Sequence, residues 1–308
     1  SLKLNRFLKK EDSIKLNFPV HQPYKDGKGG VEIGLKPIPE NSWLEIDELF
    51  PNEIALKKKL FEERRQEVLI TPSTSISIQK EVLHVLLEHL RMFHNNQFRI
   101  NDETVEIIKT KEIYNHQDDD NPLELASLLV QEDLIVMKPI NEHYHLETAS
   151  LCAPTRWSLR DKFRKSLSEI HKEVPGYKNK IDDRVNNIFS NLPNDKIFER
   201  FNWSIFDSPE LFQPINSKTL VEIGDVKPEE LFIRVERQTI RRLKKSRSVL
   251  FTVRVHVDPI TAILDNNETT LDLVKAITNL DRDMKAYKVI TPFEENLINW
   301  LKTKSINE

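Results

Sequence analysis

The residue with the most specific chemical potential is His171, which lies in a stretch whose spacing predicts an amphipathic helix over residues 158–174. Apolar residues recur there at steps of four, four, three and four: Leu159, Phe163, Leu167, Ile170 and Val174. Ser158 is the expected N-cap, and Pro175-Gly176 ends the helix. The imidazole borders the apolar stripe, so it is either a metal ligand facing an apolar cavity or a histidine packed at the edge of a core.

A second group of chemically capable residues lies on a predicted strand at residues 231–240. Alternation divides its side chains into two faces: Arg234, Glu236 and Gln238 on one, and Val235, Arg237 and Thr239 on the other. We favour Arg237 towards a pocket, because an arginine beside valine and threonine on an inner face needs an anionic or polar partner. Glu236 is the alternative if the face is reversed, Asn202 on the preceding strand is a further candidate, and a surface ion pair is the third interpretation.

The composition excludes several classes of protein. The 308 residues are 38% hydrophobic and 31% charged, with 46 Lys and Arg against 49 Asp and Glu, so neither disorder nor a field attracting nucleic acid or an anionic membrane is expected. Cys152 is the only cysteine, which excludes an internal disulfide and an iron–sulfur cluster held by this chain alone. With no long apolar run and no secretory signal, we expect a cytoplasmic location.

The pattern of elements predicts an α+β fold. Residues 1–36 form an extended arm, 37–130 are mainly helical, 131–260 form the core, and 261–308 form two helices at about 269–280 and 291–302. The core contains strands at 134–137, 144–152, 196–206, 231–240 and 248–257, which we expect to form a five-stranded antiparallel sheet. Helices are inserted between its second and third strands. The basic segment 241–247 joins two strands, as a solvated hairpin tip or as a docking patch for an acidic partner.

Several segments carry a resemblance to a known family. They are residues 152–157 (Cys-Ala-Pro-Thr-Arg-Trp), 170–177 (Ile-His-Lys-Glu-Val-Pro-Gly-Tyr), 200–203, 234–243 and 250–254, with weaker matches at 34–37, Trp43 and 131–134. Taken in chain order, these segments resemble the haem-binding alpha subunit of the haem-dependent oxidative N-demethylase family. It departs from the family at Lys172-Glu173, where a proline-containing spacing is expected, and at Arg164, where a small residue is usual.

The resemblance implies a haem site on a Per-ARNT-Sim-like core, with His171 as the ligand to the iron of haem b. Arg156, Lys162 and Tyr177 flank the ligand helix and are candidates for binding the haem propionates. Arg237, Glu236 and Asn202 become candidates for contacting dioxygen or an amine. Cys152 packs inside a strand or, in a sharper alternative, is itself a thiolate ligand to haem.

The same resemblance implies an oxygenase that uses dioxygen to N-demethylate a small secondary amine such as dimethylamine and releases formaldehyde. It also implies partner subunits that carry flavin and an iron–sulfur centre and pass electrons from NADPH, and a folate-linked subunit. A non-catalytic haem-binding sensor or carrier of a gas or small amine is the alternative. A relative that has lost haem and keeps the pocket is a third possibility.

Overall fold

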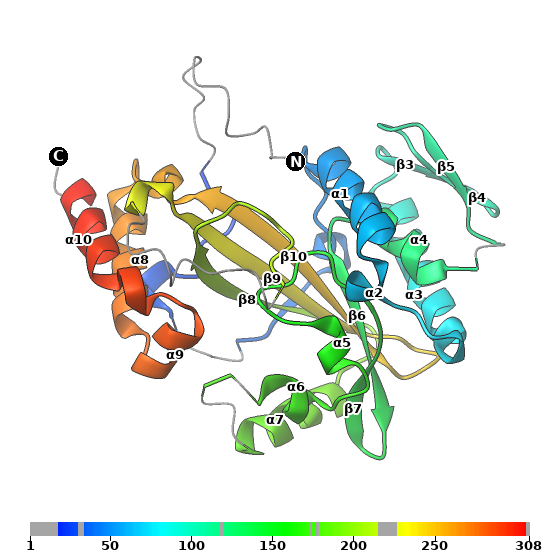
Figure 1. Cartoon of the computed structure of the whole chain (residues 1–308). Helices are drawn as coiled ribbons and strands as arrows, with labels where there is room; N and C mark the ends of the chain where they lie inside the picture. The colour runs from blue at the N-terminus through cyan, green and yellow to red at the C-terminus, as the bar shows by residue number, and fades with distance from the viewer. Residues whose placement is uncertain are drawn as a thin grey trace.

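The computed structural model describes residues 18–29, 34–117, 120–172, 174–175, 179–214 and 227–305. These residues form an α+β fold around one antiparallel sheet (Figure 1). In order across the sheet, its seven strands are β1 (Lys36–Ile38), β8 (Ile197–Phe206), β9 (Phe232–Arg242), β10 (Val249–Pro259), β6 (Asp133–Ile140), β7 (His143–Ser150) and β2 (Leu69–Ile70).

The five long strands are those that alternation predicted. Numbered by their order in the chain, they run 3-4-5-1-2 across the sheet, because β10 pairs with both β9 and β6. The β6–β7 hairpin turns through two residues with positive φ, Asn141 at 49° and Glu142 at 67°, as a two-residue turn of the right twist requires.

The predicted count of five strands is too low by two. β1 adds to the β8 edge and β2 adds to the β7 edge. Strands of three and two residues are too short to show an alternating pattern, and Pro37 lies inside the first of them. The segment 36–38 therefore belongs to the sheet, where the sequence predicts the junction between the extended arm (1–36) and the helical region (37–130).

Helices from the N-terminal half cover one face of the sheet over β6 and the neighbouring strand β10. They are α1 (Phe50–Glu63), α2 (Arg65–Val68), α3 (Ile76–Phe93) and α4 (Pro122–Leu128). With them lies a small antiparallel sheet that the sequence analysis did not predict, made of β3 (Phe98–Ile100), β4 (Thr104–Ile107) and β5 (Glu112–Asn115). Leu86 and Leu90 of α3 are fully buried in the same core as Leu134, Val136 and Leu250 of the large sheet.

The helical insert between β7 and β8 packs against the other face. It consists of α5 (Leu159–Lys162), α6 (Leu167–His171) and α7 (Asn179–Ser190). Its apolar residues share a core with the sheet residues Met137, Ile240 and Val249. The sheet is therefore covered on both faces by different parts of the chain, as a two-sided core requires.

The ligand helix predicted over residues 158–174 is in fact two short helices. Phe163 leaves helical geometry with ψ at 131°, and Arg164 has φ at 57°. The chain pairs with β7 at this point, since Arg164 N donates to Leu146 O at 2.8 Å and Leu146 N donates to Lys165 O at 3.1 Å. A new helix then begins at Ser166, which forms a reciprocal capping box with Glu169.

The C-terminal helices are α8 (Asn267–Asn279), α9 (Arg282–Tyr287) and α10 (Glu294–Ser305), grouped at one end of the sheet (Figure 1). The two predicted helices of this region correspond to α8 and α10. Residues 18–29 lie against α8, where Gly29 approaches so closely that a Cβ would collide with the carbonyl oxygen of Ala276. Within the described ranges, we find no helix with the length and apolar character needed to cross a bilayer.

Candidate functional site

Contacts of β9 show which of its two faces meets the helical insert. The guanidinium of Arg242 donates to the carbonyl oxygens of Phe189 and Leu192, which belong to the insert, and Ile240 packs in the same core. Strand alternation therefore places Glu236 on the insert-facing side as well. Arg237 lies on the opposite side, towards the segment that contains Trp43.

Glu236 is the centre of a hydrogen-bonded polar group on the insert-facing side, and only 8% of its surface is exposed. Asn202 lies directly opposite it on β8 and donates from Nδ2 to Oε2 at 3.0 Å. Thr155 donates from Oγ1 to Oε1 at 3.2 Å. We refer to Thr155, Asn202, Arg234, Glu236 and Lys288 as the Glu236 cluster.

Arg234 is the fully hydrogen-bonded cation of this cluster. It donates from Nε to Thr155 Oγ1 at 3.0 Å and from its other nitrogens to the carbonyl oxygens of Ala153, Pro154, Glu210 and Leu211. Burial lowers its pKa to about 10, while Glu236 opposes that change. Arg234 therefore anchors two loops beside Glu236 and has its donors committed to that role.

Lys288 is a member of the cluster that no pattern in the sequence predicts. It follows α9 and reaches the edge of β8, where Nζ donates to Asn202 Oδ1 at 3.0 Å and to Trp203 O at 2.5 Å. Burial lowers the pKa of its ammonium to about 8, partly offset by the negative charge of Glu236. Its protonation state can therefore change close to neutral pH.

His171 is the last residue of α6 and is half-buried. The preceding residue, Ile170, packs against the core that the insert shares with the sheet. His171 therefore follows directly after a residue of the core that the insert shares with the sheet. Lys162 is the last residue of α5 and is half-buried, whereas Tyr177 lies outside the described residues.

Arg156 is the second residue on this side with chemistry suited to a cofactor. Its guanidinium carbon lies 3.8 Å from the centre of the Phe206 ring, and its buried Nε has no hydrogen-bond partner among the described residues. Burial lowers its pKa to about 10, partly offset by Asp207. A cation with a free donor on an aromatic face is suited to a carboxylate. An imidazole and a guanidinium with a free donor are the residue types that a haem iron and a haem propionate require.

Arg237 has the partners that its burial requires, but on the other face of the sheet. It is 4% exposed and donates to Glu199 Oε2 at 2.8 Å, Trp43 O at 2.8 Å and Ser42 O at 2.5 Å. The sequence analysis favoured Arg237 facing the insert, and the structure shows the reversed alternative with Glu236 there. Partners 38 to 195 residues away decide this orientation, and strand alternation contains no information about them.

Cys152 packs in the interior, as one of its two interpretations predicts, but it lies in a bend just after β7 and not inside a strand. Its backbone N–H donates to Asp133 Oδ1 at 2.8 Å. Burial and the nearby carboxylate of Asp133 raise the pKa of the thiol to about 12. Without a bound metal, the thiol is therefore protonated at neutral pH.

The sequence also matches a described protein family over nearly its whole length. The model for "haem-dependent oxidative N-demethylase, alpha subunit-like" proteins matches residues 34–298. This range includes every strand of the large sheet, the helical insert with His171, and the whole Glu236 cluster. The chain belongs to the haem-dependent oxidative N-demethylase alpha subunit-like family.

Proposed function

We propose that this chain is the haem-binding oxygenase subunit of an enzyme that oxidatively N-demethylates a small secondary amine, of the size of dimethylamine, and releases formaldehyde. The observation that carries the proposal is a buried carboxylate, Glu236, on the sheet face that the His171 insert covers. Residues 131–260 form the haem-binding core, with a Per-ARNT-Sim-like arrangement. The strand order 3-4-5-1-2 and the insert between the second and third strands support this assignment.

In this proposal, His171 would hold the iron of haem b and Arg156 would hold a propionate. A neutral imidazole is a good ligand to haem iron. The free Nε of Arg156 pairs with a propionate carboxylate, and Lys162 is available at the end of α5. When bound, haem would supply the centre that activates dioxygen.

Glu236 binds the ammonium group of the substrate. Asn202 and Thr155 each donate one hydrogen bond to it and fix its orientation, and each carboxylate oxygen keeps a second lone pair for an ammonium N–H. Two cations, Arg234 and Lys288, lie beside the carboxylate before substrate arrives. Because a further cation beside Glu236 disfavours the protonated form of Lys288, substrate binding should release a proton near pH 8.

Electrons must come from outside the chain. Cys152 is the only cysteine in the sequence, so an iron–sulfur cluster requires ligands from another protein. We propose a reductase subunit that carries flavin and an iron–sulfur centre and uses NADPH, together with a folate-linked subunit that takes up formaldehyde. The "alpha subunit-like" description of the family supports the presence of further subunits.

Turnover of the haem-loaded protein tests this function. Protein supplied with reductant and dioxygen should form formaldehyde from dimethylamine. Glu236→Gln should raise the KM for the amine by about tenfold to a hundredfold with an unchanged haem spectrum, because a charged hydrogen bond contributes about 1.5–3 kcal/mol. Glu199→Gln is the matched control, since Glu199 is a carboxylate of the same sheet that pairs with Arg237 on the opposite face.

The contrary outcome distinguishes an enzyme from a sensor. A stable dioxygen complex that forms no formaldehyde across a panel of secondary amines would refute the proposed activity and favour a haem-binding sensor or carrier. An unchanged KM in Glu236→Gln with normal turnover would refute the role of Glu236 alone.

A further inference from the structure

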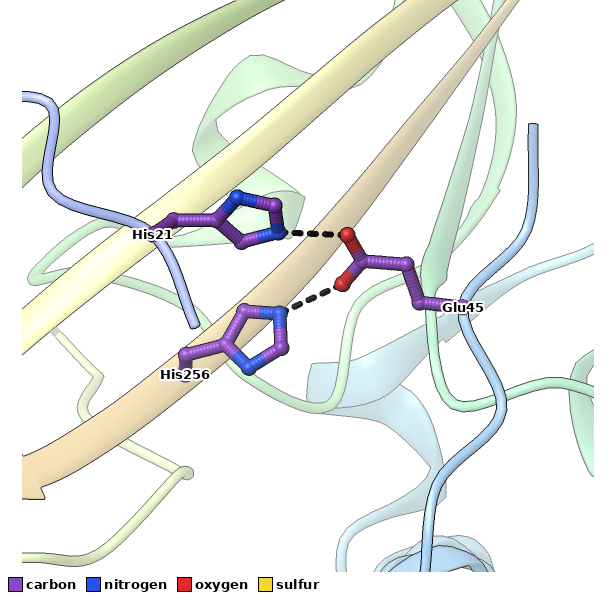
Figure 2. A group of neighbouring side chains, drawn as sticks. All are labelled: His21, Glu45 and His256. Carbon is purple, nitrogen blue, oxygen red and sulfur yellow. Dashed lines mark hydrogen bonds and ion pairs between the residues drawn. The ribbon is translucent and has the colours of Figure 1, made fainter. Parts of the chain in front are cut away.

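A second constellation lies on the sheet face opposite the helical insert. His21 from the segment 18–29, Glu45 from the connection before α1, and His256 on β10 converge there, although they are far apart in the sequence. Figure 2 shows the two imidazoles directed at the same carboxylate, one at each oxygen. The distances are 2.5 Å from His21 Nε2 to Glu45 Oε1 and 2.5 Å from His256 Nε2 to Glu45 Oε2.

The carboxylate of Glu45 is ionised in this arrangement. Burial opposes ionisation, but the hydrogen bonds with His21 and His256 outweigh it and hold the pKa of Glu45 well below its usual range. The ligand atoms of all three residues lie within 4.8 Å of one another. All three side chains are partly exposed, so an ion and a water molecule can reach them.

We propose that His21, Glu45 and His256 form a binding site for a divalent transition metal ion, with Zn²⁺ the best fit and water as the fourth ligand. Two imidazoles and one carboxylate are a ligand set that Zn²⁺ takes at about 2.0–2.2 Å. Tetrahedral arms of that length separate donor atoms by about 3.3 Å. The contact between the coordinating oxygen of Glu45 and its imidazole therefore has to open from 2.5 Å by somewhat less than 1 Å. Donor atoms that now lie up to 4.8 Å apart have to close by as much as about 1.5 Å to reach the same spacing.

The surroundings of Glu45 orient it as a ligand. Its backbone N–H donates to Glu132 Oε1 at 2.8 Å, which fixes the main chain. Arg237 Nε lies 3.4 Å from Glu45 Oε1 and 2.8 Å from Glu199 Oε2, so this cation is shared between two carboxylates. The group of Arg237, Glu45 and Glu199 therefore keeps one negative charge. Charged neighbours such as Arg237, which do not touch the metal themselves, hold ligating carboxylates in place.

A hydrogen-bonded clasp is the competing explanation. Two neutral imidazoles that each donate Nε2–H to Glu45 satisfy the carboxylate without any ion. Both explanations tie residues 18–29 to β10. Only the metal explanation predicts that one ion binds per chain. The metal explanation also requires Nε2 of both rings to be free of a proton, with the ring proton on Nδ1, so Zn²⁺ binding should weaken in acid as protons compete for the imidazoles.

Metal titration of the full chain decides between them. Chelator-treated, haem-free protein should bind one Zn²⁺ per chain with micromolar or tighter affinity, in competition with a zinc-sensitive dye. Co²⁺ at the same site should give the intense visible bands of four-coordinate geometry. His21→Gln and His256→Gln should each weaken Zn²⁺ binding by at least about tenfold. His84→Gln, an exposed histidine paired with Glu88 on α3, is the control and should bind as the wild type does.

Two results would overturn the proposal. Wild-type protein that binds no Zn²⁺ stoichiometrically, or binds it equally well after both histidines are replaced, would leave only the hydrogen-bonded clasp. Should a variant fail to fold, the Co²⁺ spectrum of the wild-type protein decides alone: bands of an octahedral, hydrated ion would count against the site. Neither result bears on haem binding at the opposite face.

Discussion

Lys288 makes the pH dependence of stability a direct test of the Glu236 cluster. The lysine is buried, and the burial lowers its pKa from 10.5 to about 8. The folded state therefore releases this proton at lower pH than the unfolded state does. Below pH 8 the charged form destabilises the fold, and the penalty is relieved as the pH rises from about 8 to 10.5. At about 1.36 kcal/mol per pH unit, the relief amounts to about 3 kcal/mol.

The perturbation is Lys288→Met, which keeps most of the side-chain volume and removes the titrating group. It also leaves Asn202 Oδ1 and Trp203 O without their donor, at a cost of about 1–3 kcal/mol for each buried acceptor. That cost does not change with pH, whereas the removed charge penalty does. At pH 7 the two effects oppose each other. The informative quantity is therefore how the difference in unfolding free energy between the two proteins changes with pH.

Urea unfolding of both proteins between pH 7 and 10.5 measures that slope. The wild type should gain about 3 kcal/mol of unfolding free energy relative to Lys288→Met over this range. Lys285→Met is the control, because Lys285 lies on α9, just before Lys288, in an ion pair with Glu294, and its difference from the wild type should change by less than about 1 kcal/mol. A constant difference between the wild type and Lys288→Met would contradict a depressed lysine pKa in the cluster.

Three further variants test other parts of the structure. Arg254→Met should lower the unfolding free energy in urea by about 3–5 kcal/mol, because it strands the buried carboxylate of Glu53; a loss below about 1 kcal/mol would contradict this ion pair. Gly29→Ala should release residues 18–29 from α8 by collision with Ala276 O, seen as faster limited proteolysis of that segment, and unchanged cleavage would refute the close approach. Arg156→Met should weaken haem binding by about tenfold in absorbance titrations with no loss of fold, and unchanged affinity would exclude Arg156 as a propionate partner.

The sequence predicted the long strands of the sheet well, because each combines apolar, aromatic or β-branched residues over eight or more positions. It failed where structure depends on a distant partner. The predicted ligand helix is interrupted at Phe163 and Arg164, since the backbone there pairs with Leu146 on β7. The edge strands β1 and β2 are too short to carry a pattern of their own.

The candidate site was predictable to a similar degree. Alternation correctly separated Glu236 from Arg237, but the choice of face depends on Glu199 and on the carbonyl groups before α1. Asn202 was predictable because neighbouring antiparallel strands bring side chains on one face together. Lys288 was missed because its contact with Asn202 spans 86 residues, and a single lysine between two helices has no sequence signature.

The most direct test of a haem held by the helical insert is the absorption spectrum of His171→Ala. Wild-type protein expressed with a haem precursor should show the Soret band of histidine-ligated haem. His171→Ala should lose it while keeping its circular dichroism, and His143→Ala, an exposed histidine on β7, should retain it. A colourless wild-type protein, or histidine-type ligation that persists in His171→Ala, would contradict the assignment.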